Sequence, residues 1–404
     1  MASAMLHLDR TNCALVHEWL TPEATGGSEL VVRQILQSID ADLYALIDFE
    51  SRNPDSYLYE RAIGHTFLQN FPKARNGVQK YLPFLPLAIE QLDLGQYDVV
   101  LSSSHAVAKG VLTYPHQLHV CYCHTPMRYA WDLTFEYLQA SRMGRGIAGW
   151  FTRALLHYLR HWDVISANRV DYFIANSRHT AQRIWRCYRR EAQVIYPPVE
   201  IDRFPFVTEK DDFYVTVCRL VSYKRVETIV RAFNQLGKPI FIIGGGPQLE
   251  MLRTIAEPNV QLLGSQPDDV VNDLVSRAKA FVYAACEDFG IAPVEAQACG
   301  TPVIAYRRGG TGETVLDPRD RPDGPTGVLF DRQTVPELVA AVEYFEQHRD
   351  RFDPHCARTQ SERFTPKIFD EQYLTFIRYC LERRDRAGKQ SVTASPNPGE
   401  GITL

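Results

Sequence analysis

Short apolar runs alternate with helical patterns along almost the whole chain, and this alternation limits the fold more than any other feature of the sequence. Strands that alternate with helices indicate parallel sheets. We therefore predict an α/β protein with parallel sheets. The runs predicted as strands are NCALVHEW, DLYALIDF, YDVVLSSS, QLHVCYCHT, DYFIANS, FYVTVCRL, KPIFIIGGG, AKAFVYAAC and TPVIAYRR.

The predicted strands fall into two groups, separated by QVIYPPVEIDRFPF at 193–206, where three prolines within nine residues stop any helix. The 404 residues also exceed what one hydrophobic core usually spans. We predict an N-terminal domain over 1–195 and a C-terminal domain over 196–363. An amphipathic helix at about 364–385 is expected to join the N-terminal domain, and the polar residues 386–404 are expected to be disordered.

The composition disfavours several classes of protein. The formal charge of −4, from 44 basic and 48 acidic residues, lacks the basic excess expected for binding to nucleic acid. No apolar stretch is long enough to span a bilayer and the first residues do not resemble a leader, so we expect a cytoplasmic protein. Nine scattered cysteines fit free thiols, and Cys121 and Cys123 are expected to pack in a strand rather than to bind metal.

Loops beyond the carboxyl ends of the strands are where parallel sheets bind ligands. Gly26 and Gly27 follow the first run and precede a helical pattern, so their amides are candidates for an anion site, with a plain turn as the alternative. Arg219 ends a strand of the second group and Lys224 follows across a short loop. Two cations that converge there suggest a diphosphate, and a solvated charged loop is the other interpretation.

The stretch EDFGIAPVE at 287–295 places two carboxylates around a predicted loop and helix start. Glu287 stands just beyond a strand, and Pro293 suits a first helical turn that also contains Glu295. We expect Glu295 to remain ionised near the positive helix end and to hold a ribose diol, while Glu287 reaches a second sugar. A capping and a surface glutamate are the alternative. The amides expected to face an anion between the carboxylates belong to Gly290, Ile291 and Ala292.

Longer motifs resemble those of the retaining family 4 glycosyltransferases, over about residues 12–383. This resemblance implies the GT-B fold, in which two Rossmann-like parallel-sheet domains face each other across a cleft. The chain looks most like the bacterial O-antigen and exopolysaccharide mannosyltransferases that use GDP-mannose. The motifs that carry the resemblance are GGSE, CHTPMRYAWD, IANSRHTAQRI, YPPVEIDRF, CRLVSYKR, IGGGPQLEMLR and EDFGIAPVEAQACGTPVIAYRRGG.

The resemblance implies a role for each matching residue. It makes Arg219 and Lys224 the clamp on the diphosphate. It makes Glu295 the ligand of the ribose and Glu287 a contact to the donor hexose. His124 matches an active-site histidine that faces the donor sugar. The family's glycine loop and its amides that meet sugar or phosphate match Gly26, Gly27, Gly290 and Ile291.

The implied reaction retains the configuration of the sugar by front-face attack, with the leaving phosphate oxygen taking the acceptor's proton. No cofactor and no metal are expected, so transfer should survive chelation. Asp40-Ala41-Asp42 has the spelling of a metal-binding Asp-x-Asp motif, but it lies at the amino end of a predicted strand, away from the ligand-binding edge. Arg219 and Lys224 would replace the metal through charge-assisted hydrogen bonds.

The acceptor is expected to be a saccharide or a lipid-linked saccharide. The stretch from Arg142 to Trp162 is basic and aromatic and has no acidic residue, which suits a helix lying on the anionic inner face of a membrane. A helix packed within its own domain is the alternative. Three other functions stay open: the same fold with a UDP-sugar donor, a sugar-nucleotide epimerase, and a catalytically silent sugar-nucleotide-binding subunit.

Overall fold

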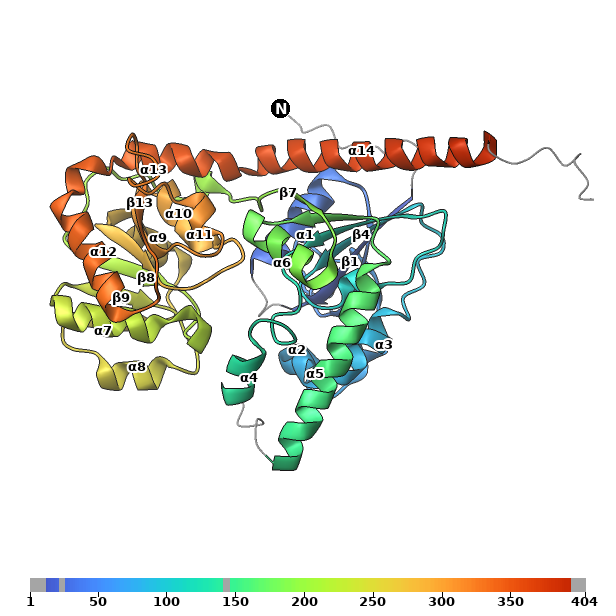
Figure 1. Cartoon of the computed structure of the whole chain (residues 1–404), viewed down its shortest axis with the longest axis horizontal. Coiled ribbons are helices and arrows are strands. Elements are labelled where there is room, and N and C mark those ends of the chain that lie inside the picture. Colours follow the sequence, from blue (N-terminus) through green and yellow to red (C-terminus); the bar gives the residue numbers. More distant parts are fainter. Residues whose placement is uncertain (1–11, 22–25, 141–145, 394–404) are drawn as a thin grey trace, which may run out of the picture. The chain divides into compact units, whose positions relative to one another are not determined.

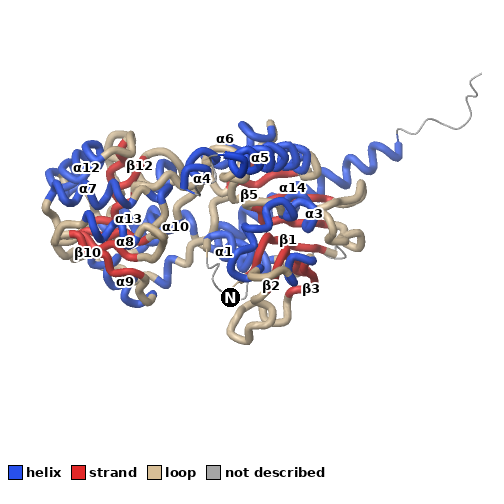
Figure 2. Tube along the Cα trace, turned by 90° about the horizontal axis from the view of Figure 1, so that it is seen from below, coloured by secondary structure: helices blue, strands red, loops and turns tan. Residues whose placement is uncertain are grey.

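The computed structural model describes residues 12–21, 26–140 and 146–393, and these form two parallel sheets (Figure 1; Figure 2). In the described residues the first sheet has seven strands in the order β3-β2-β1-β4-β5-β6-β7. The second has six, in the order β10-β9-β8-β11-β12-β13. The central strand β1 is parallel to β2 and β4, and β8 is parallel to β9 and β11. The predicted α/β class with two Rossmann-like parallel sheets is confirmed.

The first sheet consists of β1 (Cys13–Leu20), β2 (Asp42–Asp48), β3 (Ala62–His65), β4 (Val99–Ser104), β5 (Leu118–Cys123), β6 (Tyr172–Ala175) and β7 (Ala192–Val194). The second sheet consists of β8 (Tyr214–Val217), β9 (Ile240–Ile243), β10 (Val260–Gly264), β11 (Ala280–Tyr283), β12 (Val303–Tyr306) and β13 (Gly327–Phe330).

The helices of the first half of the chain are α1 (Gly27–Ser38), α2 (Ala74–Gly77), α3 (Leu85–Ile89), α4 (Thr134–Ala140), α5 (Gly146–Ala167) and α6 (Arg178–Tyr188). Those of the second half are α7 (Val226–Leu236), α8 (Leu249–Ile255), α9 (Asp268–Arg277), α10 (Ile291–Ala298), α11 (Thr311–Thr314), α12 (Val335–Gln347), α13 (Pro354–Ser361) and α14 (Pro366–Thr393).

All nine predicted runs form strands, whereas β3, β7, β10 and β13 were not predicted from the sequence. Within the described chain these four are the outermost strands of the two sheets. An outermost strand has a neighbour on one side only, so its sequence can be shorter and more polar. β7, for example, has no fully buried residue, and β10 has one.

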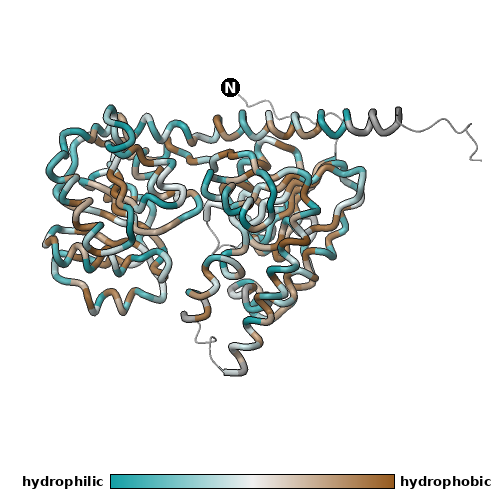
Figure 3. Tube along the Cα trace, viewed as in Figure 1, coloured by the Kyte–Doolittle hydropathy of each residue, from teal (hydrophilic) through white to brown (hydrophobic). Residues whose placement is uncertain are grey.

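The core of the second sheet follows the alternation of side chains along its strands, which are among the hydrophobic segments in Figure 3. In β8, Tyr214 packs on one face with buried residues of α7 and α12. Its neighbours Phe213 and Val215 pack on the other face with residues of α9 and α10. Because both faces are covered, the carboxyl ends of these strands are the part of the sheet left for loops that bind ligands.

The chain divides into two compact units. The described parts of residues 1–123, 158–174 and 370–404 form the first unit, and those of 124–157 and 175–369 form the second. Within the first unit, Asp370 of α14 accepts hydrogen bonds from Gln34 Nε2 at 2.8 and 2.9 Å and from Ser38 Oγ at 2.6 Å, both on α1. The carboxylate therefore ties the start of α14 to the first sheet's helix.

The helix α14 runs to Thr393, past its predicted end near residue 385, so residues 386–393 are helical rather than disordered. Polar residues of the predicted tail continue the helix, because Arg, Lys and Gln have good helix propensity. The remainder of that tail, 394–404, lies outside the described residues, as do Arg142 and Arg145 of the basic stretch. Across the described residues, no helix is both long and apolar enough to cross a membrane.

Candidate active site

Two of the predicted site residues, Lys224 and Glu287, form an ion pair in the second unit. Lys224 ends a short 3-10 turn (Ser222–Lys224) after β8, and Glu287 lies in the loop after β11. The Lys224 Nζ atom is 2.6 Å from Glu287 Oε1 and donates to the Tyr283 hydroxyl at 2.9 Å. Burial disfavours the charge on Lys224, but Tyr283 and Glu287 outweigh burial and raise the pKa of Lys224 above its usual value. The amine therefore stays protonated.

Arg219 lies directly beyond the carboxyl end of β8, in the same loop as Lys224. It is exposed, and its guanidinium makes no hydrogen bond or ion pair with any residue that the structure describes. An exposed guanidinium keeps its charge and has five N–H donors available. Arg219 is thus available to an anion, whereas Lys224 is engaged with Glu287.

The loop after β11 leads into α10 through Gly290, which has φ +84° and ψ 80°. Only glycine adopts such a conformation without strain, so the turn into the helix depends on this residue. The same loop is held from outside by Gly310, whose amide donates to Glu287 O at 2.9 Å. A Cβ atom at Gly310 would lie 2.2 Å from Phe289 O, so glycine is required for this close approach.

The predicted amides at the start of α10 belong to the N-cap and the first two residues of the helix, Gly290, Ile291 and Ala292. The first N–H groups of a helix have no acceptor within it, and in the described structure none of the three donates to a loop or cap acceptor. These amides remain suited to an anion.

Glu295 is the fifth residue of α10, so it lies in the second helical turn and not in the first as predicted. Burial raises its pKa to about 7, Arg203 partly opposes the rise, and Asp268 adds to it. The expectation that Glu295 stays fully ionised is therefore wrong near neutral pH. Removal from water outweighs the helix dipole, whose effect fades beyond the first turn.

A cavity of about 320 Å³ opens beside Glu295 in the second unit. Gly244 and Ser265 border it at the carboxyl ends of β9 and β10. Asp268 and Asn272 contribute from α9. The cavity combines backbone, amide and carboxylate groups at the sheet edge where a parallel sheet binds ligands.

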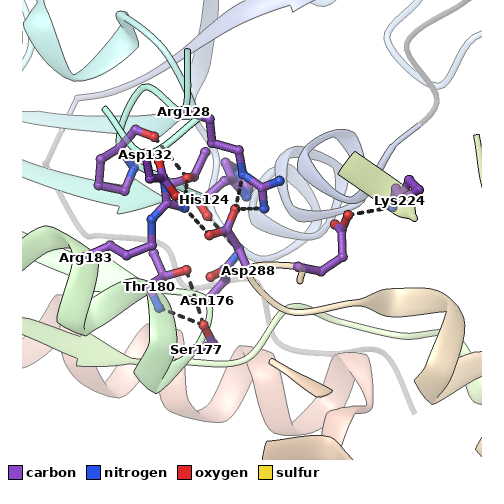
Figure 4. Close-up of polar contacts among 12 residues, drawn as sticks. His124, Arg128, Asp132, Asn176, Ser177, Thr180, Arg183, Lys224 and Asp288 are labelled. Atoms are coloured by element: carbon purple, nitrogen blue, oxygen red, sulfur yellow. Dashed lines mark hydrogen bonds and ion pairs between the residues drawn. The ribbon is translucent and has the colours of Figure 1, made fainter. Parts of the chain in front are cut away.

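Asp288, next to Glu287, joins two arginines that the sequence did not point to (Figure 4). It accepts from Arg128 Nε at 2.9 Å and forms ion pairs with both Arg128 and Arg183. Arg183 on α6 also pairs with Asp132 at 2.6 Å. Burial alone would raise the pKa of Asp288, but the two guanidiniums lower it to about 2. This network connects the EDFG loop to the loop after β5.

His124 follows β5 directly and is buried, with 8% of its surface exposed. Its carbonyl oxygen accepts a hydrogen bond from Asn176 Nδ2 at 3.0 Å. Figure 4 draws His124 in the same close-up as Arg128 and Asp288. The preceding Cys121 and Cys123 are buried free thiols, as predicted.

Gly26 and Gly27 stand at the start of α1 in the first unit, but the amide of Gly26 is not free. It donates to Glu29 Oε2 at 3.0 Å, and Ser28 Oγ donates to the same oxygen at 2.9 Å. A carboxylate therefore already occupies part of the predicted anion site, because Glu29 lies one turn into the helix and folds back onto its start.

The Asp-x-Asp spelling lies where the sequence placed it. Asp42 begins β2 at the amino end of the strand and accepts a hydrogen bond from the Tyr97 hydroxyl at 2.7 Å. Its carboxylate therefore stabilises the edge of the first sheet that lies opposite the ligand-binding loops.

Two protein families match the chain. Residues 25–203 match the family described as Glycosyltransferase Family 4, and residues 199–361 match the family described as Glycosyl transferases group 1. The two matches run without a break from residue 25 to residue 361. Each half of the chain therefore resembles a glycosyltransferase domain, and the two Rossmann-like sheets are those of the GT-B fold.

Individual relatives are similar over part of the chain. A GDP-mannose-dependent alpha-(1-6)-phosphatidylinositol monomannoside mannosyltransferase of Mycolicibacterium smegmatis is 30% identical over 210 residues, which cover 43% of this chain and 53% of that protein. The chain thus spans about half the length of this curated relative.

Solved structures are similar over most of the chain. Sucrose-phosphate synthase from Thermosynechococcus elongatus has a TM-score of 0.68 at 17% identity, covering 92% of this chain and 100% of that one. HepE of Anabaena in complex with UDP-glucose has a TM-score of 0.63 at 18% identity, covering 90% and 99%. At these identities the structures establish the fold, and neither the donor nor the acceptor follows from them.

Proposed function

We propose that the chain transfers a hexose from a nucleotide sugar, GDP-mannose, to a saccharide or lipid-linked saccharide with retention of configuration. The observation that carries the proposal is the group of donor-site residues at one sheet edge of the second unit. The Lys224–Glu287 pair, the exposed Arg219 and the cavity beside Glu295 all follow strands of the second sheet.

The chemistry required of this group is stabilisation of a leaving anion. When the bond between the anomeric carbon and the phosphate oxygen breaks, positive charge develops on the sugar and negative charge on the nucleoside diphosphate. Arg219, Lys224 and the amides at the start of α10 would neutralise the diphosphate. The acceptor hydroxyl attacks the face that the diphosphate leaves, and a phosphate oxygen takes its proton, so no carboxylate base is needed.

The Lys224–Glu287 pair gives a reason for Glu287 to respond to the donor. In the structure each partner neutralises the other at 2.6 Å. A diphosphate carries more negative charge than one carboxylate, so it would draw Lys224 toward itself. Glu287 would then be released to accept hydrogen bonds from hexose hydroxyls.

The preference for a guanine nucleotide rests on the mannosyltransferase relative and on the carboxylate of Asp268 beside the cavity. That relative is described as GDP-mannose-dependent. Asp268 lines the cavity together with Glu295, the proposed ribose ligand. A guanine edge presents neighbouring N–H donors, which a carboxylate accepts well. A UDP-sugar donor would use the same clamp and is the second candidate.

For the acceptor we propose a lipid-linked saccharide of envelope polysaccharide assembly, reached at an anionic membrane through α5. The described part of α5 buries Leu156 and Leu159 but leaves Trp150 66%, Tyr158 49% and Ile165 58% exposed. These three exposed side chains share one helical face, and Arg153 nearby is exposed as well. An apolar face with basic neighbours suits the headgroup region of a bilayer.

A screen of nucleotide sugars by thermal shift, followed by hydrolysis and transfer assays on those that bind, tests the donor proposal. We expect GDP-mannose to raise the melting temperature more than UDP-glucose and to be hydrolysed slowly without acceptor. Preference for UDP-glucose would replace the guanine assignment. Binding without hydrolysis or transfer would indicate a silent subunit, and conversion of the free nucleotide sugar to its epimer would indicate an epimerase.

A further inference from the structure

A compact cluster of nitrogen and oxygen ligand atoms lies in the first unit, apart from the donor-site residues of the second unit. His17 and Glu18 are neighbours on β1, and His105 follows β4, the strand paired with β1. His17 and Glu18 are fully buried and His105 is partly buried. His17 Nε2 or Nδ1, one carboxylate oxygen of Glu18 and a ring nitrogen of His105 lie within 4.8 Å of one another.

The ring of His17 is oriented by its backbone contact. Its Nδ1 atom lies 3.0 Å from the carbonyl oxygen of Ser103, which can only accept, so Nδ1 carries the proton. Nε2 then presents a lone pair in the neutral ring. That atom is buried and has no hydrogen-bond partner in the described structure. A carbonyl that holds one ring N–H of a histidine is the usual way to aim the other nitrogen at a metal.

The carboxylate of Glu18 is anchored through one oxygen only. Oε1 accepts from the Ser104 hydroxyl at 3.0 Å and from three backbone amides at 2.7 to 3.1 Å. Four donors fix the plane of the group. The second oxygen, Oε2, is buried without a hydrogen bond to the described residues and lies 3.0 Å from His105 Nδ1. Oε2 also lies 4.0 Å from His17 Nδ1, so the anchored carboxylate places it close to both histidine rings.

Two further side chains complete the surroundings. Glu29 Oε1 lies 3.8 Å from His17 Nε2, so a fourth oxygen is close to the cluster. The ring of Trp19 packs edge-on against His105 with centroids 4.6 Å apart. The Trp19 ring shields His105 from water and the Glu29 carboxylate adds negative charge, and both favour the binding of a cation.

We propose that His17, Glu18 and His105 bind a divalent transition metal, with zinc the best fit and Glu29 available as a fourth ligand. Two imidazole nitrogens and a carboxylate oxygen are a ligand set that zinc prefers over magnesium and calcium. Bonds of about 2.0–2.2 Å bring ligand atoms to roughly 3–4 Å from each other. The separation of His105 Nδ1 from Glu18 Oε2, 3.0 Å, and that of His17 Nε2 from Glu29 Oε1, 3.8 Å, are in that range.

This metal would have a structural or acceptor-side role, because its ligands belong to β1, α1 and the loop after β4 and not to the diphosphate clamp. The proposed site does not conflict with our expectation that no metal holds the diphosphate, because it lies at other residues. The proposal does not depend on the transfer reaction, so it can be tested on metal content alone.

The test uses the full chain, produced without a histidine tag, exposed to zinc and then dialysed against metal-free buffer. We expect about one zinc per chain by elemental mass spectrometry, as for a site with three protein ligands. We also expect that cobalt gives the visible absorption of a tetrahedral nitrogen and oxygen site. The variants are His17→Gln and His105→Ala, and the control is His116→Gln, at an exposed histidine outside the cluster.

Loss of at least tenfold of the bound zinc in His17→Gln or His105→Ala, with full binding in His116→Gln, supports the site. His105→Ala keeps the test valid if His17→Gln fails to fold, because His105 is only partly buried. A wild-type chain that retains no zinc and shows no zinc-dependent change in melting temperature would overturn the proposal. The cluster would then be an ion pair of Glu18 with a protonated His105.

Discussion

Donor affinity should depend on pH through Glu295, and the structure sets the size of the effect. The pKa of this carboxyl is raised to about 7 in the empty site, mainly by burial. The proposed role, accepting hydrogen bonds from a ribose diol, needs the ionised form. With a pKa of about 7 the ionised fraction falls from about 0.9 at pH 8 to about 0.1 at pH 6. Affinity should fall with it by about tenfold, which corresponds to about 1.4 kcal/mol.

The direction of the pH dependence follows from the raised pKa of Glu295. A raised carboxyl pKa means that protonation is favoured below about pH 7, so binding weakens as the pH falls. Calorimetric titration with GDP-mannose at several pH values would measure this, because the diphosphate of a nucleotide sugar does not itself titrate in that window. Burial lowers the pKa of His179, a neighbour of Asp288, which moves its titration toward the acidic end of this window.

The control variant is Glu295→Gln, which keeps the shape of the side chain and removes its titration. We expect the variant to bind more weakly at pH 8 and to show little dependence on pH. An affinity of the wild type that stays constant between pH 6 and pH 8 would refute the reasoning. A pH dependence that persists unchanged in Glu295→Gln would place the titrating group elsewhere.

Three further outcomes are expected. Arg219→Ala and Lys224→Ala should each reduce donor turnover by about 10²-fold or more, because each removes a positive charge that stabilises the leaving anion. The melting temperature should stay unchanged in Arg219→Ala, whose side chain is exposed, and near wild-type rates in both variants would contradict the clamp. Asp288→Asn should lower the free energy of unfolding by about 2 kcal/mol, because the two arginines lower the pKa of the Asp288 carboxyl from 3.8 to about 2. Denaturant titration at pH 7 would measure this, and unchanged stability would contradict the network. Replacing Trp150 and Phe151 by serine should reduce co-sedimentation with anionic vesicles at low salt; equal sedimentation of both proteins with anionic and neutral vesicles would contradict the membrane proposal.

Much of the candidate site could be predicted from the sequence, because its residues directly follow strands. Lys224 and Glu287 each lie a few residues after a predicted strand, and parallel strands bring their carboxyl ends to one edge. Arg128 and Arg183 were missed, since they are separated by 160 and 105 residues from Asp288 and no spacing connects them to it. The signal available was the charge in CHTPMRYAWD, whose partner only the fold supplies.

The Gly26 amide shows a different limit. The sequence indicated a glycine turn before a helix, and that turn is present. It did not show that Glu29 would bend back to accept from Gly26 at 3.0 Å. A side chain three residues into a helix can cap the start of the helix or point into solvent. Which conformation Glu29 adopts depends on neighbours such as His17, which lies on β1.

The local sequence pattern was enough to predict the two-sheet architecture. Apolar strands buried on both faces are short, periodic and rich in branched side chains, and these features can be recognised from neighbouring residues alone. The sequence did not predict the outermost strands β3, β7, β10 and β13, since a strand with a neighbour on one side only can be less apolar. The protonation of Glu295 was not predictable in this way either. It was expected to be ionised from its place near a helix start, but burial raises its pKa to about 7. Desolvation depends on which distant segments cover a group, so the charge of Glu295 and the pairing of Asp288 were decided only when the chain folded.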